Sequence, residues 1–303
     1  MRRTIIYHED LDGICAAAIA LKHARAHGVS CSFVPMDHGR PMEWMAFDEN
    51  WFKHDRDECW LLDFSFEPLV MAKLRSVVGN NLVWIDHHKT AIEAAGEFAD
   101  LKGVRDIADA ACLLTWHFCF PNDPAPDAVR FIADRDTWTF ARGDQTRWAC
   151  EILAHEIHDA GPLADVWKSL LMPRDGRHGS GTLGRDVLEI GRYMYEARIR
   201  LLRAMARKYG ETCSTQFQNP ASPGGLIWTF SINHPPSGDL GQVIKDMGHA
   251  IAHVFVDQYR PGGGWVRKHT LYSDTVDVSA IAAQYGGGGH RGAAGWIQVL
   301  PQA

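Results

Sequence analysis

Residues 82–88, with the sequence LVWIDHH, decide how the first half of the chain folds. Four apolar residues in a row predict a strand that is buried on both faces, and such strands belong to parallel sheets covered by helices on both sides. An aspartate and two histidines follow at once, where the strand ends. In parallel α/β sheets ligands bind beyond the carboxyl ends of the strands, so a site is expected at this end.

The same pattern occurs at two earlier places in the chain. Short apolar runs at residues 4–7 and 60–62 also lead directly into acidic or imidazole side chains. These side chains are His8, Asp10, Asp12 and Asp63. Amphipathic helical stretches separate the runs, as in successive βαβ units. Three strand ends that deliver acids and imidazoles to one edge indicate a site rather than solvated strand termini.

The chain of 303 residues is long enough for two ordinary domains. A long amphipathic helix is predicted over residues 187–205, and a second alternation of strands and helices follows it. We predict an α/β protein with three parts. These are a parallel-sheet domain at 1–150 with helices on both faces, a helical connector at 151–215 and a smaller α/β domain at 216–303.

The composition is that of a soluble globular protein, with 46% hydrophobic and 22% charged residues. A net charge of -6 argues against an extensive nucleic-acid coat. The first apolar run is too short for a signal peptide or a membrane span, and the seven cysteines are scattered without a C-x-x-C pair. We expect a cytoplasmic protein with reduced thiols and no membrane contact. A homodimer is compatible with the sequence, although no segment marks an interface.

The residue types at the predicted edge are those that hold divalent cations. His8, Asp10 and Asp12 alternate by two, which on an extended segment places all three on one side. Crowded carboxylates repel each other unless a cation lies between them. With Asp63 and His87 the set is rich in oxygen and lacks thiolate, which suits Mn²⁺ or Mg²⁺ better than structural zinc. The number of groups predicts two ions that share a bridging carboxylate, as in metal-assisted phosphoryl transfer.

A further carboxylate is expected to complete the site. Residues 131–140, FIADRDTWTF, offer Asp134 and Asp136 after an apolar run. Either aspartate also fits a helix cap or a salt bridge, so the pattern by itself leaves the choice open.

The other strong feature is YGGGGHRGAAG at residues 285–295. Four consecutive glycines permit positive φ and let an anion approach the backbone N–H groups closely. A histidine and an arginine follow and can hold its charge. A flexible hairpin is the alternative interpretation. The residues expected to bind a phosphate are Gly287, Gly288, Gly289, His290 and Arg291.

The order of these motifs resembles the DHH phosphoesterase superfamily, in the subgroup with a C-terminal DHHA1 domain. The matching stretches are HEDLDG, LLDFS, the name-giving DHH at 86–88, and GGGGHRGAAG followed by a strand. The resemblance covers nearly the whole chain. It implies a DHH domain that holds two Mn²⁺ ions, with Mg²⁺ as a substitute, and a DHHA1 domain that folds over the cleft to hold substrate.

The resemblance also implies the ligands of each ion. Those of one ion are His8, Asp10 and Asp63. Those of the other are Asp12, Asp63, His87 and Asp136, with Asp63 as the bridge. Asp136 is chosen over Asp134 because DTWTF is similar to the D-T-G-x-F segment of nanoRNA-degrading relatives. His88 would face the scissile phosphate, and Asp86 would orient the neighbouring histidines.

Two departures from the family pattern concern the substrate. Only one residue separates His8 from Asp10, where many relatives have H-x-x-P-D. The family segment S-L-R-S is matched by TLYS, which puts Tyr272 in place of a substrate-binding arginine. Arg267 or Lys268 could compensate for it.

We expect a Mn²⁺-dependent phosphoesterase that cleaves very short oligonucleotides as an exonuclease, or small nucleotides such as 3'-phosphoadenosine 5'-phosphate. One alternative is a hydrolase of pyrophosphate or polyphosphate, and another is a nucleic-acid-binding module without activity. Aromatic side chains in the cleft would favour oligonucleotides because bases stack on them. Tyr272 or Trp265 could serve.

Overall fold

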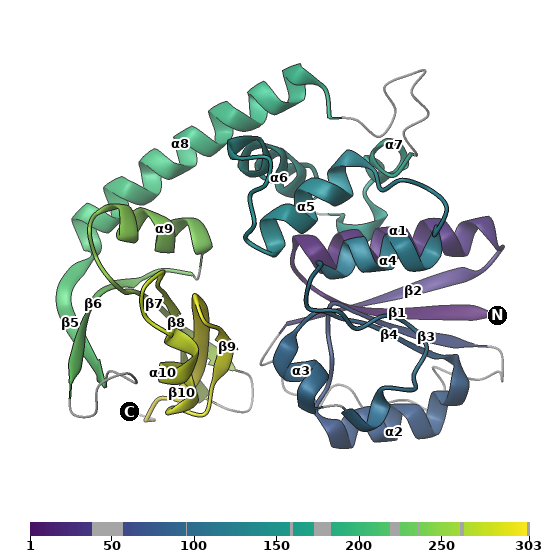
Figure 1. Ribbon diagram of the computed structural model, residues 1–303, viewed down its shortest axis with the longest axis horizontal. Coiled ribbons are helices and arrows are strands. Elements are labelled where there is room, and N and C mark those ends of the chain that lie inside the picture. The colour runs from purple at the N-terminus through teal and green to yellow at the C-terminus, as the bar shows by residue number, and fades with distance from the viewer. Residues whose placement is uncertain are drawn as a thin grey trace. The chain divides into compact units, whose positions relative to one another are not determined.

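The computed structural model describes residues 1–37, 57–94, 96–157, 160–172, 183–218, 225–235, 237–260 and 264–301 (Figure 1). Contacts divide the chain into two compact units, Met1–Tyr195 and Glu196–Ala303. Each unit is built on its own β-sheet, so the predicted class of a parallel-sheet α/β unit joined to a smaller α/β unit is confirmed. The division lies inside helix α8 (Arg185–Tyr209). The expected three-part division at residues 150 and 215 stays a prediction.

The first unit holds a sheet of four strands that are all parallel. The strands are β1 (Arg2–His8), β2 (Ser30–Met36), β3 (Glu58–Leu62) and β4 (Leu82–Ile85). Their order in the sheet is β2-β1-β3-β4. Because all four run the same way, their carboxyl ends meet at one edge.

Helices cover both faces of this sheet (Figure 1). The covering helices are α1 (Leu11–Ala26) and α4 (Ala111–Cys119) on one face, with α2 (Pro68–Val78) and α3 (Lys89–Ala94) on the other. Neighbouring strand residues point to opposite faces, so Ile5 packs in the cluster of α1 while Ile6 packs in the cluster of α2. Burial on both sides explains why these strands read as unbroken apolar runs.

The remaining helices of this unit follow the sheet along the chain. They are α5 (Asp127–Asp136), α6 (Asp144–Ile157), α7 (Trp167–Leu170) and the first part of α8. Short 3₁₀ turns lie at Gly79–Asn81, Gly96–Phe98 and Gly161–Leu163. Apolar residues of α5 and α6 join the cluster that covers the α1 face, which fixes the end of α5 near the strand ends.

The second unit holds a six-stranded sheet of order β5-β6-β7-β8-β10-β9. Its strands are β5 (Glu211–Gln218), β6 (Leu226–Asn233), β7 (Ala252–Arg260), β8 (Gly264–Tyr272), β9 (Gly288–His290) and β10 (Ala293–Val299). Only β6 and β7 pair in parallel, so the sheet is mixed. Strand β5 was not predicted from the sequence.

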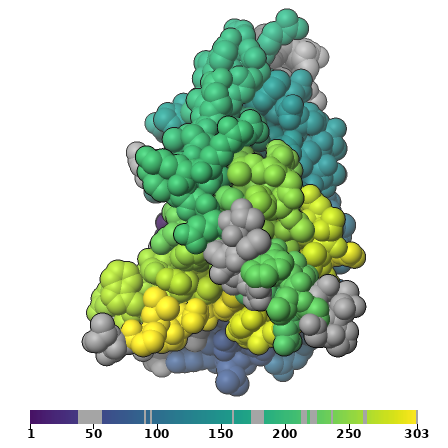
Figure 2. Space-filling view, turned by 90° about the vertical axis from the view of Figure 1, so that its left-hand side faces the viewer, coloured from purple at the N-terminus to yellow at the C-terminus, as the bar shows by residue number. Residues whose placement is uncertain are grey.

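Each face of the second sheet packs on its own helices. α9 (Gly238–Asp246) and the second part of α8 share a cluster with Val254, while α10 (Val278–Ala283) shares another with Leu271. The outer side of α8 lies at the surface, as Figure 2 shows.

Within the described residues, no helix combines the length and the apolar character that crossing a bilayer requires. The described thiols are free: Cys15, Cys31, Cys59, Cys112, Cys119 and Cys150.

Two histidines inside the second sheet form a buried hydrogen-bonded chain. His269 Nε2 lies 3.0 Å from the side-chain oxygen of Gln298, and its Nδ1 lies 2.9 Å from His253 Nε2. His253 Nδ1 lies 2.9 Å from the hydroxyl of Ser231. With Gln298 as acceptor, each neutral ring donates through Nε2 and accepts through Nδ1. Burial, and then the charges of His269 and Arg267, lower the pKa of His253 to about 3.

The low pKa of the buried His253 predicts that acid destabilises the second unit. The pKa of His253 in the folded protein lies below its ordinary value of 6.5. The stability that the neutral side chain contributes is therefore fully present above pH 6.5 and is lost as the pH falls toward 3. We expect the free energy of unfolding to fall by about 1.4 kcal/mol per pH unit in this window through His253. Denaturant unfolding at pH 7, 6, 5 and 4 measures the slope.

The His253→Gln variant should show a shallower slope than the parent protein. His234→Gln is the matched control, since His234 is more exposed and bonds to the carbonyl of Pro235 outside the buried histidine chain. Equal slopes for the parent and His253→Gln would contradict the prediction.

Candidate metal centre

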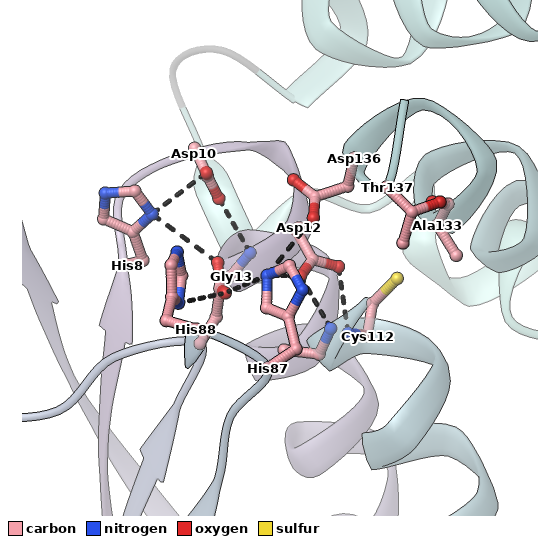
Figure 3. Close-up of polar contacts among 12 residues, drawn as sticks. His8, Asp10, Asp12, Gly13, His87, His88, Cys112, Ala133, Asp136 and Thr137 are labelled. Carbon is pink, nitrogen blue, oxygen red and sulfur yellow. Dashed lines mark hydrogen bonds and ion pairs between the residues drawn. The ribbon is translucent and has the colours of Figure 1, made fainter. Parts of the chain in front are cut away.

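Acidic and imidazole side chains converge at the carboxyl edge of the first sheet (Figure 3). Three groups have ligand atoms within 4.8 Å of one another, namely Asp63-His87-His88, His8-Asp10-Asp63 and Asp12-His87-Asp136. Asp63 and His87 belong to two groups each. All six residues that the sequence marked as metal ligands are therefore brought together, and each group could hold a divalent ion.

The motif HEDLDG turns from strand to helix rather than staying extended. His8 ends β1, Asp10 caps α1 by accepting from the backbone N–H of Gly13 at 3.0 Å, and Asp12 lies in the first helical turn. A Cβ on Gly13 would lie 2.2 Å from the carbonyl oxygen of His8, so the turn requires glycine. The expectation of three residues alternating on an extended segment is wrong. The cap and the first turn bring them together instead.

Asp12 is held by the start of a distant helix. Its two carboxylate oxygens accept from the backbone N–H groups of Ala111 at 2.8 Å and Cys112 at 2.9 Å, at the start of α4. Burial, followed by the charges of Asp63 and Asp136, raises the pKa of Asp12 well above its usual range. The sequence gives no signal for these two donors, because they are backbone groups some 100 residues away.

Asp63 lies at the centre of the site in an unusual backbone conformation. It follows β3 with φ of 55°, a left-handed value that a non-glycine residue rarely adopts, and its N–H donates to Ile85 at 2.9 Å. Its side chain is 1% exposed, and neither carboxylate oxygen has a hydrogen-bond partner among the described residues. The nearest imidazole nitrogens are His87 Nε2 at 3.3 Å and His8 Nδ1 at 3.5 Å.

The environment of Asp63 is unfavourable for a bare carboxylate. Burial, followed by the charge of Asp10, raises the pKa of Asp63 well above its usual range, even though His8 acts in the opposite direction. A buried carboxylate that lacks donors costs free energy unless a cation compensates its charge. This is where a bridging cation ligand would be expected.

Asp86 organises the turn that carries the two histidines. It is fully buried, and its Oδ1 accepts from the N–H groups of His87 at 2.7 Å and His88 at 3.1 Å. The same oxygen lies 2.8 Å from His88 Nδ1, and Oδ2 accepts from the indole of Trp84 at 3.2 Å. Burial alone would raise the pKa of Asp86, but the hydrogen bonds from His88 outweigh it and lower this pKa. Asp86 thus fixes the orientation of the turn that carries His87 and His88.

The structure gives Asp134 and Asp136 different roles. Asp136 ends α5 with its Oδ2 3.2 Å from His87 Nε2. Asp134 points into the following loop instead, where it accepts from the N–H groups of Ala141 at 2.7 Å and Arg142 at 3.2 Å and from the Thr146 hydroxyl. Asp136 therefore joins the site, whereas Asp134 closes the loop.

The donor set fits divalent cations. Asp63 offers two buried oxygens without donors, and burial together with neighbouring negative charge raises the pKa of Asp12, Asp63 and Asp136 alike. Carboxylates that disfavour one another's ionisation are stabilised by a cation between them. The groups contain oxygen and imidazole nitrogen but no thiolate, which suits Mn²⁺ or Mg²⁺.

The glycine-rich segment forms a paired hairpin in the second unit. Gly288–His290 makes edge strand β9, which pairs with the start of β10. A Cβ on Gly287 would lie 2.1 Å from the carbonyl oxygen of Gly295, and Gly289 has φ of 137°, so both positions favour glycine. His290 and Arg291 are exposed. The segment is a close-packed β-hairpin, and its binding of an anion stays a prediction.

The side chains considered for base stacking differ in exposure. Tyr272 packs against Gly241 and joins the cluster of α9, and burial raises its pKa. Trp265 is 53% exposed on β8. Arg267, considered as a substitute for the missing arginine, makes a two-point ion pair with Asp257 at 2.6 and 2.7 Å.

No protein-family model matches the chain. A curated relative, "Uncharacterized protein R106" of Acanthamoeba polyphaga mimivirus, is 25% identical over 249 residues. The match covers 78% of this chain and 52% of that protein, so the chain spans about half the length of this relative.

Two solved structures align with nearly the whole chain. RecJ in complex with Mn²⁺ from Thermus thermophilus is 18% identical with a TM-score of 0.46, covering 97% of this chain and 49% of that one. An exopolyphosphatase-related protein from Bacteroides fragilis is 12% identical with a TM-score of 0.47, covering 99% of this chain and 88% of that one. At these TM-scores the overall likeness does not indicate which reaction or ligand the site supports. Only the side chains of the site can indicate it.

Three stretches of the first unit resemble motifs of the DHH superfamily. The three stretches of the first unit that resemble it, HEDLDG, LLDFS and DHH, meet at one edge of one sheet. This convergence of side chains, and not the overall alignment, indicates what the site can bind.

Asp134 and Asp136 give a matched test of the site. Mn²⁺ should raise the melting temperature of the parent protein, because a ligand that binds only the folded state stabilises it. Asp136→Asn should lose most of this increase while the metal-free protein keeps its stability.

Asp134→Asn should do the reverse. It should lower the metal-free free energy of unfolding by about 1–3 kcal/mol, since its loop loses charge-assisted hydrogen bonds, and keep the increase with Mn²⁺. Thermal melts with and without Mn²⁺ measure both quantities. An unchanged metal response in Asp136→Asn would remove this residue from the ligand set.

Proposed function

We propose that this protein is a divalent-cation-dependent phosphoesterase that hydrolyses very short oligonucleotides or small nucleotides such as 3'-phosphoadenosine 5'-phosphate. The observation that carries the proposal is the buried Asp63 carboxylate, which has no hydrogen-bond donor among the described residues and lies within ion-pairing distance of three histidines from two strand ends. The resemblance in motif order to the DHH phosphoesterases supports the same reading.

The proposed ligands follow the three groups of the site. One ion would be held by His8, Asp10 and Asp63, and the other by Asp12, Asp63, His87 and Asp136. When bound, two such cations polarise phosphoryl oxygens, activate water and neutralise the charge on the leaving oxygen. Mn²⁺ is the proposed ion, and Mg²⁺ is a substitute with the same preference for oxygen.

The chain's own side chains would then orient and hold the substrate. Asp86 holds His88 through Nδ1, so we assign Nε2 of His88 to the scissile phosphate. Burial alone would lower the pKa of His88, but the hydrogen bond that its Nδ1 donates to Asp86 outweighs burial and raises this pKa. A protonated imidazole donates to a developing negative charge and stabilises it. Asp86 acts as a positioning residue through His88.

The glycine-rich segment is the proposed anion-binding element of the second unit. Gly287, Gly288 and Gly289 would admit a phosphate close to the backbone, and His290 and Arg291 would hold its charge. The exposed edge strand β9 supports this role.

Two other functions remain as competitors. A hydrolase of pyrophosphate or polyphosphate would use the same cations, but it needs only cationic groups beyond them. A nucleic-acid-binding module without activity would not need the carboxylates at all. The complete set of carboxylates at the site disfavours the second competitor.

Replacing the bridging carboxylate tests the mechanism. Asp63→Ala should lower kcat by several orders of magnitude, because both proposed ions lose a shared ligand. The variant should stay folded, since it relieves the crowding of buried carboxylates around Asp63. Mn²⁺-dependent hydrolysis and circular dichroism measure the two effects.

Asp123→Ala is the control for this experiment, because Asp123 is an exposed acid outside the three groups. It should keep the parent activity. A fully active Asp63→Ala enzyme would refute the bridging role.

A substrate panel separates the competing functions. We expect turnover of RNAs of two to five nucleotides, or of 3'-phosphoadenosine 5'-phosphate, in the presence of Mn²⁺. Phosphate release and chromatography of the products measure each substrate beside polyphosphate and pyrophosphate. Turnover of polyphosphate or pyrophosphate alone would establish the first competitor in place of our proposal.

A further inference from the structure

A tryptophan follows the metal-ligand candidate Asp136 in a backbone conformation that favours glycine. α5 ends at Asp136, and Trp138 has φ of 56° with its N–H bonded to the carbonyl of Arg135 at 3.0 Å. Helices commonly end with a left-handed residue at this point, usually glycine, because a Cβ is disfavoured there. The family segment D-T-G-x-F, which DTWTF resembles, has glycine in this place.

Burial in a core does not explain the tryptophan. The side chain of Trp138 is 42% exposed. Its ring meets Phe140 edge to face with centroids 4.8 Å apart, and the guanidinium of Arg135 lies 5.9 Å from the ring centroid. Phe140 is itself left-handed, with φ of 49°. Two aromatic residues in strained conformations on one short loop indicate a function for the loop.

The indole borders the candidate metal centre within the first unit. A cavity of about 210 Å³ lies against Trp138, with Leu11 and Ile132 as its apolar wall. Its polar wall consists of Asp10, Asp12 and Asp136 together with Arg135. A ligand in this cavity would therefore touch a flat aromatic surface and the proposed cation ligands together.

We propose that Trp138 is the platform on which a nucleobase of the substrate stacks, beside the cation site. The inference rests on the proposed function and narrows it to substrates that carry a base. Base–aromatic stacking is a strong and sequence-tolerant contact, since every base presents a π-face. Pyrophosphate and polyphosphate have no surface that could use an exposed indole. Trp138 thereby favours nucleotides over these phosphoanhydrides.

Trp138→Gly is the informative variant because glycine adopts the left-handed conformation without a Cβ. Its melting temperature should equal or exceed that of the parent, so any loss of binding is not a loss of fold. The KM for a dinucleotide should rise about tenfold while kcat changes less, as expected from one lost stacking contact. Binding of 5'-AMP with Mn²⁺, measured by calorimetry, should weaken by a similar factor.

Two further variants control the experiment. Trp138→Phe keeps an aromatic face and should retain most of the affinity for 5'-AMP. Trp228→Ala removes another exposed tryptophan, 51% exposed on β6 of the second unit, and should bind 5'-AMP like the parent.

The outcomes separate this inference from the proposed function. Unchanged AMP affinity and KM in Trp138→Gly, together with continued Mn²⁺-dependent hydrolysis, would overturn the base platform and leave the phosphoesterase in place. A loss of AMP affinity in Trp138→Phe as large as in Trp138→Gly would also overturn it. Weakened AMP binding in Trp138→Gly, in a protein that hydrolyses no substrate of the panel, would support the platform and remove the proposed function.

Discussion

The structure of the first unit depends on negative charge that is crowded into a buried edge of the sheet. Asp12 and Asp63 are almost completely buried, and Asp136 lies beside them. Burial and the charges of Asp63 and Asp136 raise the pKa of Asp12. Burial and the charges of Asp10 and Asp136 raise the pKa of Asp63. Proteins keep such groups where a cation or a chemical role compensates the cost. The left-handed backbone of Asp63, held by the bond to Ile85, is a second local cost at the same point. Both costs fit the metal centre that we propose.

Hydrogen bonds around the candidate site fix the side chains that carry the proposed metal-binding atoms. Asp12 is held by backbone donors at the start of α4, and Asp10 caps α1. Asp86 contributes no ligand atom to the three groups, yet it holds the turn of both histidines. These hydrogen bonds hold the side chains of the candidate site in place on strand ends and helix starts, which would reduce the reorganisation needed for a cation to bind.

The loop after α5 carries an aromatic residue beside the candidate site. Asp134 closes this loop by hydrogen bonds, so the loop does not depend on glycine for its shape. That leaves room for an aromatic residue at the helix end, where Trp138 reaches the rim of the acidic cavity. In the proposed function, the cation ligands would define the reaction type, and the side chains around them would define which phosphate ester is accepted.

The sequence by itself determined the parallel sheet, the edge that carries the candidate site and five of the six ligand candidates, because unbroken apolar runs and the residues after them are local signals. It did not determine the turn at Gly13, where a close backbone contact ended the expected extended segment. Nor did it reveal the backbone N–H groups that donate to Asp12. It distinguished Asp136 from Asp134 only through a family resemblance. The exposed position of Trp138 was equally hidden. These features depend on contacts between residues distant in sequence and on backbone angles, which only the tertiary structure decides.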